Sequence, residues 1–318
     1  MLLQAASPIG IPVVSLDPQV DAPAKQVSQP SLMPVSSSST TKLNHLDGHF
    51  TSSDMIRQLA SQVDILTIEI EHVDVNALRT VADELSSTGG RSGKGVKVYP
   101  APQVIAIIQD KYLQKQHLAA KGIPVAPFAP ITATPETETK DKKALVQAVL
   151  AAGDAFGYPL MLKSRHLAYD GRGNYLLRSN SDEDILAALD ALIPDSSIAS
   201  RPVGDTLYAE KFAPFVKEAA VMVVRGADGQ TRSYPAVETI HKDNICHIVY
   251  APLRPTKTDR DGVGREQKGK EIGREKIGKR AQREAQRAIS ALGDGAVGVF
   301  GVEMFLMEDG PAFCFRFP

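Results

Sequence analysis

Helical and extended patterns alternate along the first part of the chain, and this alternation limits the fold more than any other feature. The stretch DMIRQLASQ has helical spacing, VDILTIEIEHV after it is typical of a strand, and VNALRTVADEL returns to helical spacing. Before them, MLLQAA predicts a helix end and IPVVSLDP (11–18) predicts a buried strand. Strands that alternate with helices are typical of α/β proteins with parallel sheets. We therefore expect an α/β fold at the start of the chain.

Composition excludes several classes of protein. The chain has 318 residues, which predicts two or three compact modules. Its formal net charge of −1 offers no strong field for a nucleic acid or a membrane surface, so neither is expected as a partner. No apolar run reaches the roughly 18 residues of a spanning helix. Cys246 and Cys314 cannot form a disulfide framework and lack metal-ligand spacing, which favours a reducing, cytoplasmic setting.

The rest of the chain reads as helices followed by antiparallel strands. An apolar stripe that includes Ile107, Leu113 and Leu118 predicts one helix ending near Gly122. Apolar stretches on both sides of the GADGQ turn predict a hairpin. The segment 254–280 is basic without apolar periodicity, which favours a surface insertion over a nucleic-acid patch. A helix at 283–292 and the strand AVGVFGVEMFLMEDG are expected after it.

One lysine stands inside an apolar strand. Lys163 lies in YPLMLKSR, and a buried lysine is costly unless it is paired. Its stem could instead snorkel to solvent at a sheet edge. The glycine-rich RHLAYDGRGN follows directly, and backbone N–H groups of such a loop together with a lysine can bind nucleotide phosphates. DGRG by itself is weak support, because Asp-Gly turns are common.

Several carboxylates occupy positions where a ligand could explain them. Glu210 and Glu218 flank KFAPF, a pattern that suits an adenine hinge with a ribose acceptor, although a solvated hairpin would look similar. Glu303 interrupts an apolar strand, and a carboxylate there is expensive unless it binds a cation or hydrogen-bond donors. Glu69 and Glu71 end a strand, where acids often face a ligand crevice or simply meet solvent.

The ordered motifs carry a family resemblance. QDKYLQK, GYPLMLKSRHLAYDGRGN, LYAEKFAPFVKEAAVMVVR, YPAVETIHKDNICHIVYAPLR and GVFGVEMFLMEDG resemble the carboxyaminoimidazole ribonucleotide synthases, which are ATP-grasp enzymes of purine biosynthesis. In fungi this enzyme is the N-terminal part of a fused protein that is classed as a carboxy-lyase. The resemblance covers nearly the whole chain apart from 86–97 and 255–279. It implies an ATP-grasp fold, α/β overall and α+β in the grasp module, with an N-terminal Rossmann-like pre-ATP-grasp domain.

The resemblance also implies a division into domains and a reaction. We expect an incomplete N-terminal domain at 1–100, a linker helix and lid at 101–207, and a grasp subdomain at 208–318 with a basic insertion at 255–280. The implied reaction is the ATP-dependent carboxylation of aminoimidazole ribonucleotide by bicarbonate through carboxyphosphate. ATP and Mg²⁺, or Mn²⁺ in its place, are the implied cofactors. A homodimer is left open.

Site residues follow from the resemblance, position by position. The implied nucleotide contacts are Lys111, Lys163, Leu167, Ala168, Gly171, Gly173, Glu210, Lys211, Phe212, Ala213, Glu218 and His241. The implied substrate contacts are Glu69, Tyr169, Asp170 and Arg172, of which the last three are also the catalytic candidates. The implied magnesium ligand is Glu303.

The chain departs from the family pattern at both ends. It starts just after the glycine-rich loop with which the family begins, and Cys314 and Phe315 stand where the family has Asn and the second metal carboxylate. We therefore expect a sequence that is truncated at both ends, with little or no turnover at this length. Two other interpretations stay open: a catalytically dead nucleotide-binding fragment, and a different ATP-grasp carboxylate–amine ligase.

Overall fold

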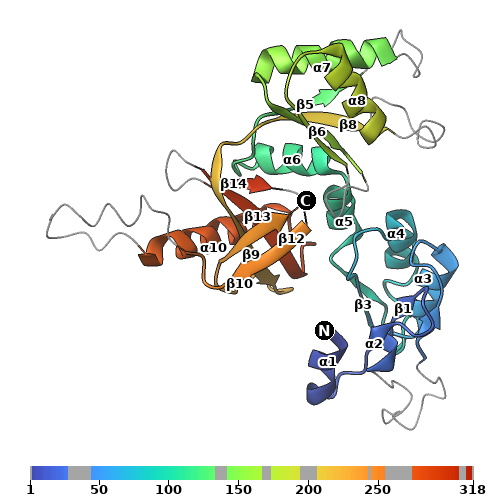
Figure 1. The fold of residues 1–318 in the computed structure, drawn as a ribbon. Helices are drawn as coiled ribbons and strands as arrows, with labels where there is room; N and C mark the ends of the chain where they lie inside the picture. The colour runs from blue at the N-terminus through green and yellow to red at the C-terminus, as the bar shows by residue number, and fades with distance from the viewer. Residues whose placement is uncertain are drawn as a thin grey trace, which may run out of the picture. The chain divides into compact units, whose positions relative to one another are not determined.

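The chain forms two compact units, and each is built around its own sheets. The computed structural model describes residues 2–27, 44–132, 142–166, 173–193, 206–242, 245–254, 274–307 and 313–316. The units are Met1–Ala106 and Ile107–Pro318 (Figure 1). Across these described stretches, no helix combines the length and the apolar character that crossing a bilayer requires.

The first unit alternates short strands with helices. Its elements in chain order are α1 (Leu2–Ala6), the 3-10 helix η1 (Ser7–Ile9), β1 (Leu16–Asp17), α2 (Pro23–Gln26), β2 (Leu46–Asp47), α3 (Ser53–Ser61), β3 (Ile65–Thr67), α4 (Val75–Glu84) and β4 (Lys97–Tyr99). Helix α5 (Pro102–Gln109) begins in this unit and ends in the second. Strand β1 pairs with β2, and β3 pairs with β4, both in parallel. Helices α3 and α4 pack over a core that includes Ile56, Leu66, Leu78 and Val98.

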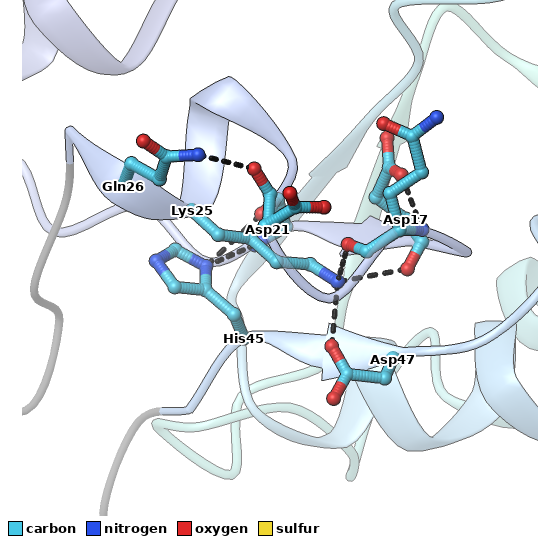
Figure 2. A network of polar contacts seen from close by, with 8 residues as sticks. Asp17, Asp21, Lys25, Gln26, His45 and Asp47 are labelled. Atoms are coloured by element: carbon cyan, nitrogen blue, oxygen red, sulfur yellow. Dashed lines mark hydrogen bonds and ion pairs between the residues drawn. The ribbon is translucent and has the colours of Figure 1, made fainter.

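A lysine in α2 ties this helix to the first pair of strands. Lys25 Nζ donates to the backbone carbonyl of Asp17 at 2.8 Å and lies 2.6 Å from Asp47 Oδ1 (Figure 2). The Ser15 N–H donates to His45 Nδ1 at 3.1 Å, just before the two strands pair. Although β1 and β2 share only two residue pairs, these side chains hold the pairing in place.

The second unit begins with α6 and a four-stranded antiparallel sheet. The elements are α6 (Lys111–Ala120), β5 (Phe128–Ile131), α7 (Lys142–Phe156), β6 (Leu160–Ser164), β7 (Asn174–Leu177), α8 (Asp182–Leu192) and β8 (Leu207–Lys211). The strand order is β5-β8-β6-β7. Leu160, Leu162, Leu207 and Ala209 alternate along their strands and pack under α7 and α8. Side chains of the intervening residues therefore point to the opposite face, where α6 lies (Figure 1).

A larger antiparallel sheet follows. Its elements are β9 (Phe215–Arg225), β10 (Thr231–Ser233), β11 (Val237–Lys242), β12 (Ile245–Tyr250), α10 (Arg274–Ala291), β13 (Gly298–Met307) and β14 (Phe313–Arg316). The strand order is β12-β11-β9-β13-β14, and β10 pairs with β9 beyond the hairpin turn that the sequence predicts. Helix α10 packs on β9, over the face that buries Ala219, Val221 and Val223. We call the opposite face of this sheet the open face.

Two expected strands are shorter than predicted. In the stretch 11–18 only Leu16–Asp17 is a strand, and its side chains are half-buried rather than buried. The strand expected over VDILTIEIEHV extends only over Ile65–Thr67. Both strands pair with a single described partner over two or three residues, and a strand extends only as far as a neighbouring strand accepts its backbone hydrogen bonds.

Two expected helices also differ. The single helix predicted before Gly122 is broken into α5 and α6, because Asp110 accepts hydrogen bonds from the Tyr112 and Leu113 N–H groups and so begins a new helix. The helix predicted at 283–292 begins earlier, at Arg274, so the final residues of the proposed basic insertion are helical. Its buried stripe consists largely of alanines, including Ala281 and Ala285, and so gives a weak hydrophobic pattern.

Candidate functional site

Strand register brings Lys163 and Glu210 together. Strand β6 pairs with β8 so that Lys163 lies opposite Tyr208 and Met161 lies opposite Glu210. Lys163 and Glu210 are therefore diagonal neighbours on one face, within reach of long side chains. Lys163 Nζ lies 3.5 Å from Glu210 Oε2, and both residues are buried. The lysine within the apolar strand is thus paired, and the interpretation that its stem snorkels to solvent does not apply.

A second lysine approaches the same carboxylate from α6. Lys115 is fully buried, and its Nζ lies 3.1 Å from Glu210 Oε2. It also lies 5.8 Å from the centre of the Phe128 ring on β5, the residue that pairs with Glu210. Burial by itself would raise the pKa of the Glu210 carboxyl, but the Lys163 and Lys115 ammonium groups lower it, and the net shift is downward. Glu210 is therefore an ionised carboxylate with two cations on one oxygen.

The start of α6 is a second charged centre. Asp110 caps this helix, and the Arg165 guanidinium donates to both of its carboxylate oxygens. The Lys111 N–H donates to the Arg165 carbonyl at 2.8 Å, and the Lys111 side chain is buried. Although burial raises the pKa of Asp110, hydrogen bonds from Arg165 and from the Leu113 N–H lower it overall. The N-terminus of α6 is thus fixed to the strand end that leads toward the glycine-rich loop.

Aromatic rings fill the space between α6 and the sheet. Tyr112 packs edge-on against Phe128, with ring centres 5.4 Å apart, and lies 6.0 Å from Tyr208. The Arg165 guanidinium lies 4.9 Å from the centre of the Tyr112 ring. Burial, followed by the charges of Glu210 and Asp110, raises the pKa of Tyr208 well above its ordinary value. A neutral phenol therefore separates the two charged centres.

The hinge residues continue from the end of β8. The Lys211 N–H donates to the Pro127 carbonyl at 2.8 Å, and Lys211 itself is exposed. Phe212 is exposed and Ala213 is buried, and the Ala213 carbonyl accepts from the Phe215 N–H at 2.9 Å. This is an extended segment that presents backbone groups and one aromatic ring, the kind of surface on which a planar base can lie.

The open face of the larger sheet gathers three predicted site residues. Glu218 pairs with Thr239 on β11 and with Phe305 on β13, and Glu303 lies two residues from Phe305. Because paired residues share a face, Glu218 and Glu303 lie on the same side of the sheet. His241 lies two residues after Thr239 and so on the same face, and its Nδ1 contacts Glu218 Oε2. Glu218 and His241 thus form a contact pair, and Glu303 lies on the neighbouring strand.

The described residues do not form a complete magnesium site. Glu303 is the only candidate ligand that the sequence suggests, and nowhere in the described stretches do three His, Cys, Asp or Glu side chains cluster as a metal site would require. Magnesium binds oxygen ligands in octahedral geometry, usually through one or two carboxylates and substrate phosphates. The single carboxylate of Glu303 supplies only one of these oxygen ligands, so no chemical step is assigned to the metal.

Other predicted site residues lie elsewhere. Glu69 belongs to the first unit, where it is exposed after β3. Gly173 has a φ of +81°, and its carbonyl accepts from the Ser164 N–H at the end of β6 at 2.8 Å. Six of the predicted loop residues lie outside the described part of the chain: Leu167, Ala168, Tyr169, Asp170, Gly171 and Arg172.

Sequence reasoning missed three charged residues of this region. Lys115, Asp110 and Arg165 each contact another charged side chain here. The spacing of Lys115 carried a usable signal, because it lies four residues after Lys111 and so shares its helix face. The Asp110–Arg165 pair joins distant segments, and no local pattern indicates it.

Comparison with known proteins identifies two family domains along the chain. The model of the ATP-grasp domain matches residues 116–260, and the model of the ribonucleotide synthetase preATP-grasp domain matches residues 1–109. Residues 116–260 therefore match an ATP-grasp domain, preceded by a preATP-grasp domain. The expected fold class, an ATP-grasp fold behind a pre-ATP-grasp domain, is thereby confirmed.

Individual ATP-grasp relatives are similar along nearly the whole chain. Phosphoribosylaminoimidazole carboxylase of Candida glabrata is 38% identical over 97% of this chain, and that of Candida albicans is 41% identical over 97%. The chain spans 43% of the length of each of these relatives. A carboxyaminoimidazole ribonucleotide synthase structure from Aspergillus clavatus, complexed with ATP, is 38% identical with a TM-score of 0.73, and the match covers 99% of this chain and 65% of that one.

A second Aspergillus clavatus structure carries two ligands. This N5-carboxyaminoimidazole synthase, in complex with ADP and 5-aminoimidazole ribonucleotide, is 36% identical with a TM-score of 0.72. The match covers 99% of this chain and 65% of that chain. The resemblance inferred from the ordered motifs is therefore confirmed.

Proposed function

We propose that this protein uses ATP to carboxylate aminoimidazole ribonucleotide with bicarbonate, as an ATP-grasp ligase of purine biosynthesis. The observation that carries the proposal is the buried group of lysines around Glu210. Lys163 and Lys115 place two cations on one carboxylate oxygen, and buried positive charge in excess of negative charge suits an anionic ligand such as a nucleotide polyphosphate. The chain with this group is 38% identical to a synthase crystallised with ATP.

The proposed chemistry has two steps. Bicarbonate attacks the γ-phosphorus of ATP, a bond to that phosphorus forms, and ADP leaves, which yields carboxyphosphate. The amine of the ribonucleotide then attacks the carboxyl carbon, the bond from that carbon to the phosphate oxygen breaks, and inorganic phosphate leaves with the bonding electrons. The amine releases one proton, which the departing phosphate accepts. The first step makes the second one feasible, because hydroxide is a poor leaving group and phosphate is a good one. In such phosphoryl transfer the protein mainly positions the reactants and neutralises charge.

The described residues can be given roles in binding. Lys163 and Lys111 would neutralise the phosphates of ATP, while the segment 210–213 would contact adenine and Glu218 with His241 would contact the nucleoside. Glu69 would bind the ribonucleotide. Tyr169, Asp170 and Arg172 would face the substrate. Glu303 would contribute one oxygen ligand to Mg²⁺, and a bound Mg²⁺ would supply positive charge that neutralises the phosphates.

Three further assignments are also proposals. We place the protein in the cytoplasm, on the basis of its two isolated cysteines. We propose a linker helix and lid at 101–207, most of which belongs to the second unit, and a grasp subdomain from 208 onward. We propose small molecules as its ligands, with a homodimer as the oligomeric state to examine.

The reaction is tested by following phosphate release from the protein with ATP, bicarbonate and aminoimidazole ribonucleotide. We expect release that depends on all three, together with transfer of ¹³C from labelled bicarbonate to the amine. Lys163→Met should weaken ADP binding by calorimetry by about tenfold or more, the scale of one lost charge contact. Release with a different amine acceptor would point instead to another ATP-grasp ligase, and ADP binding without any release would point to a nucleotide-binding fragment.

A further inference from the structure

Lys115 is buried so completely that it cannot meet a ligand in solvent directly. Its side chain has 0% relative exposure, whereas that of Lys163 retains 11%. Both ammonium groups approach Glu210 Oε2, at 3.1 Å for Lys115 and 3.5 Å for Lys163. The two lysines therefore differ in their exposure to solvent, although both contact the same carboxylate. Any effect of Lys115 on a bound ligand has to act through another residue, and Glu210 is a charged residue that it contacts.

Sharing the carboxylate creates a competition for Lys163. If Lys163 turns from Glu210 toward a phosphate, the carboxylate at the buried Glu210 loses one of its cations. A buried carboxylate left without a counter-charge costs several kcal/mol. Lys115 comes from α6 and lies near the Phe128 ring on β5, whereas Lys163 lies on β6, the other neighbour of β8. Lys115 can therefore remain on Glu210 when Lys163 turns away.

We propose that Lys115 is a positioning residue that neutralises Glu210 so that Lys163 can leave this carboxylate and bind the phosphates of the nucleotide. This inference rests on the proposed function for its ligand and adds a residue that sequence comparison with the family motifs did not single out. Without Lys115, Glu210 would retain Lys163 and compete with the ligand for it. Loss of Lys115 should therefore weaken the binding of polyphosphates. This weakening should occur only while Glu210 carries its negative charge.

A double-mutant cycle tests the proposal. Calorimetry would measure the affinities for ADP and for inorganic tripolyphosphate, which has no adenine and so is insensitive to the hinge. Lys115→Met should weaken both by about tenfold, the scale of one charge contact. Adding Glu210→Gln to Lys115→Met should restore most of the tripolyphosphate affinity, because the competing charge is then gone. Lys115→Arg, which keeps the charge, should bind tripolyphosphate more tightly than Lys115→Met.

A matched control separates positioning from folding. Lys25 in the first unit also has a largely buried side chain, with 6% exposure, that is paired with a carboxylate, although that of Asp47 is exposed. Lys25→Met should lower thermal stability and leave the affinities for both probes unchanged. If Lys115→Met does not fold, the Glu210→Gln variant by itself still tests the proposal. This variant should bind tripolyphosphate at least as tightly as the unchanged protein. Weaker binding would overturn the proposal.

The remaining outcomes also decide between explanations. If Lys115→Met binds both probes as the unchanged protein does, this inference fails while the proposed function stands. If the changes in tripolyphosphate affinity caused by Lys115→Met and by Glu210→Gln simply add in the double variant, Lys115 has only a structural role. The inference is then overturned. If the unchanged protein binds neither probe, the proposed function and this inference fail together.

Discussion

At the scale of single residues, Asp110 combines two roles that a substitution can separate. It caps α6 and it also pairs with Arg165. Asp110→Asn keeps a good capping residue but loses the ion pair, so we expect the free energy of unfolding at pH 7 to fall by about 1–3 kcal/mol. Urea denaturation at a series of pH values would measure this loss.

The pH dependence of the Asp110 effect has a definite sign. The folded protein holds the pKa of Asp110 below its ordinary value, so the stability that this carboxylate contributes is present above the unfolded pKa of about 3.9 and is lost as the pH falls through the folded pKa. The difference between Asp110→Asn and the unchanged protein should therefore shrink below about pH 4. Asp74 caps α4 in the same way without a described ion pair, so Asp74→Asn should change stability little at any pH. Equal losses at both positions would refute the role of the ion pair.

At the scale of elements, Glu238 joins three segments of the larger sheet. It lies on β11 and contacts Lys217 on β9 at 2.8 Å, and Arg254 beyond β12 donates to both of its oxygens. Hydrogen bonds from Arg254 lower the pKa of Glu238 despite its burial. Glu238→Gln removes the charge that both cations share, and we expect a loss of about 1–3 kcal/mol by urea denaturation, reduced because Arg254 is partly exposed.

An exposed pair provides the comparison for Glu238. Arg57 and Glu84 join α3 to α4 at 3.0 Å, with about half of each side chain exposed to solvent. Glu84→Gln should cost less than about 0.5 kcal/mol, because water and salt screen surface pairs. A loss at Glu84 as large as that at Glu238 would show that burial does not distinguish them.

At the scale of the whole molecule, the proposed nucleotide contacts are concentrated in one unit. All of them lie in Ile107–Pro318, whereas Glu69 lies in Met1–Ala106. Binding to the native state suppresses local opening near the ligand, so ADP should slow hydrogen exchange in β6 and β8 by about tenfold or more when it is saturating. Exchange in α3 and α4 should not change. Protection by ADP confined to the first unit would contradict the assignment.

Local sequence patterns were sufficient to predict the fold class, most of the helices and the presence of a lysine within an apolar strand. Hydrophobic periodicity and capping act over a few neighbouring residues, so α3, α4 and β6 could be predicted from the chain alone. Two strands were predicted too long, because the length of a strand depends on the partner that pairs with it.

Only the tertiary structure decided which charges meet. The contact of Lys115 with Glu210 and that of Asp110 with Arg165 join segments far apart in sequence. The placement of Glu218, His241 and Glu303 on one face depends on strand register. A carboxylate at a given position has the same local pattern whether it is solvated or paired. Its partner is chosen by packing between elements, because the cost of burying a charge depends on what lies within a few ångströms of it.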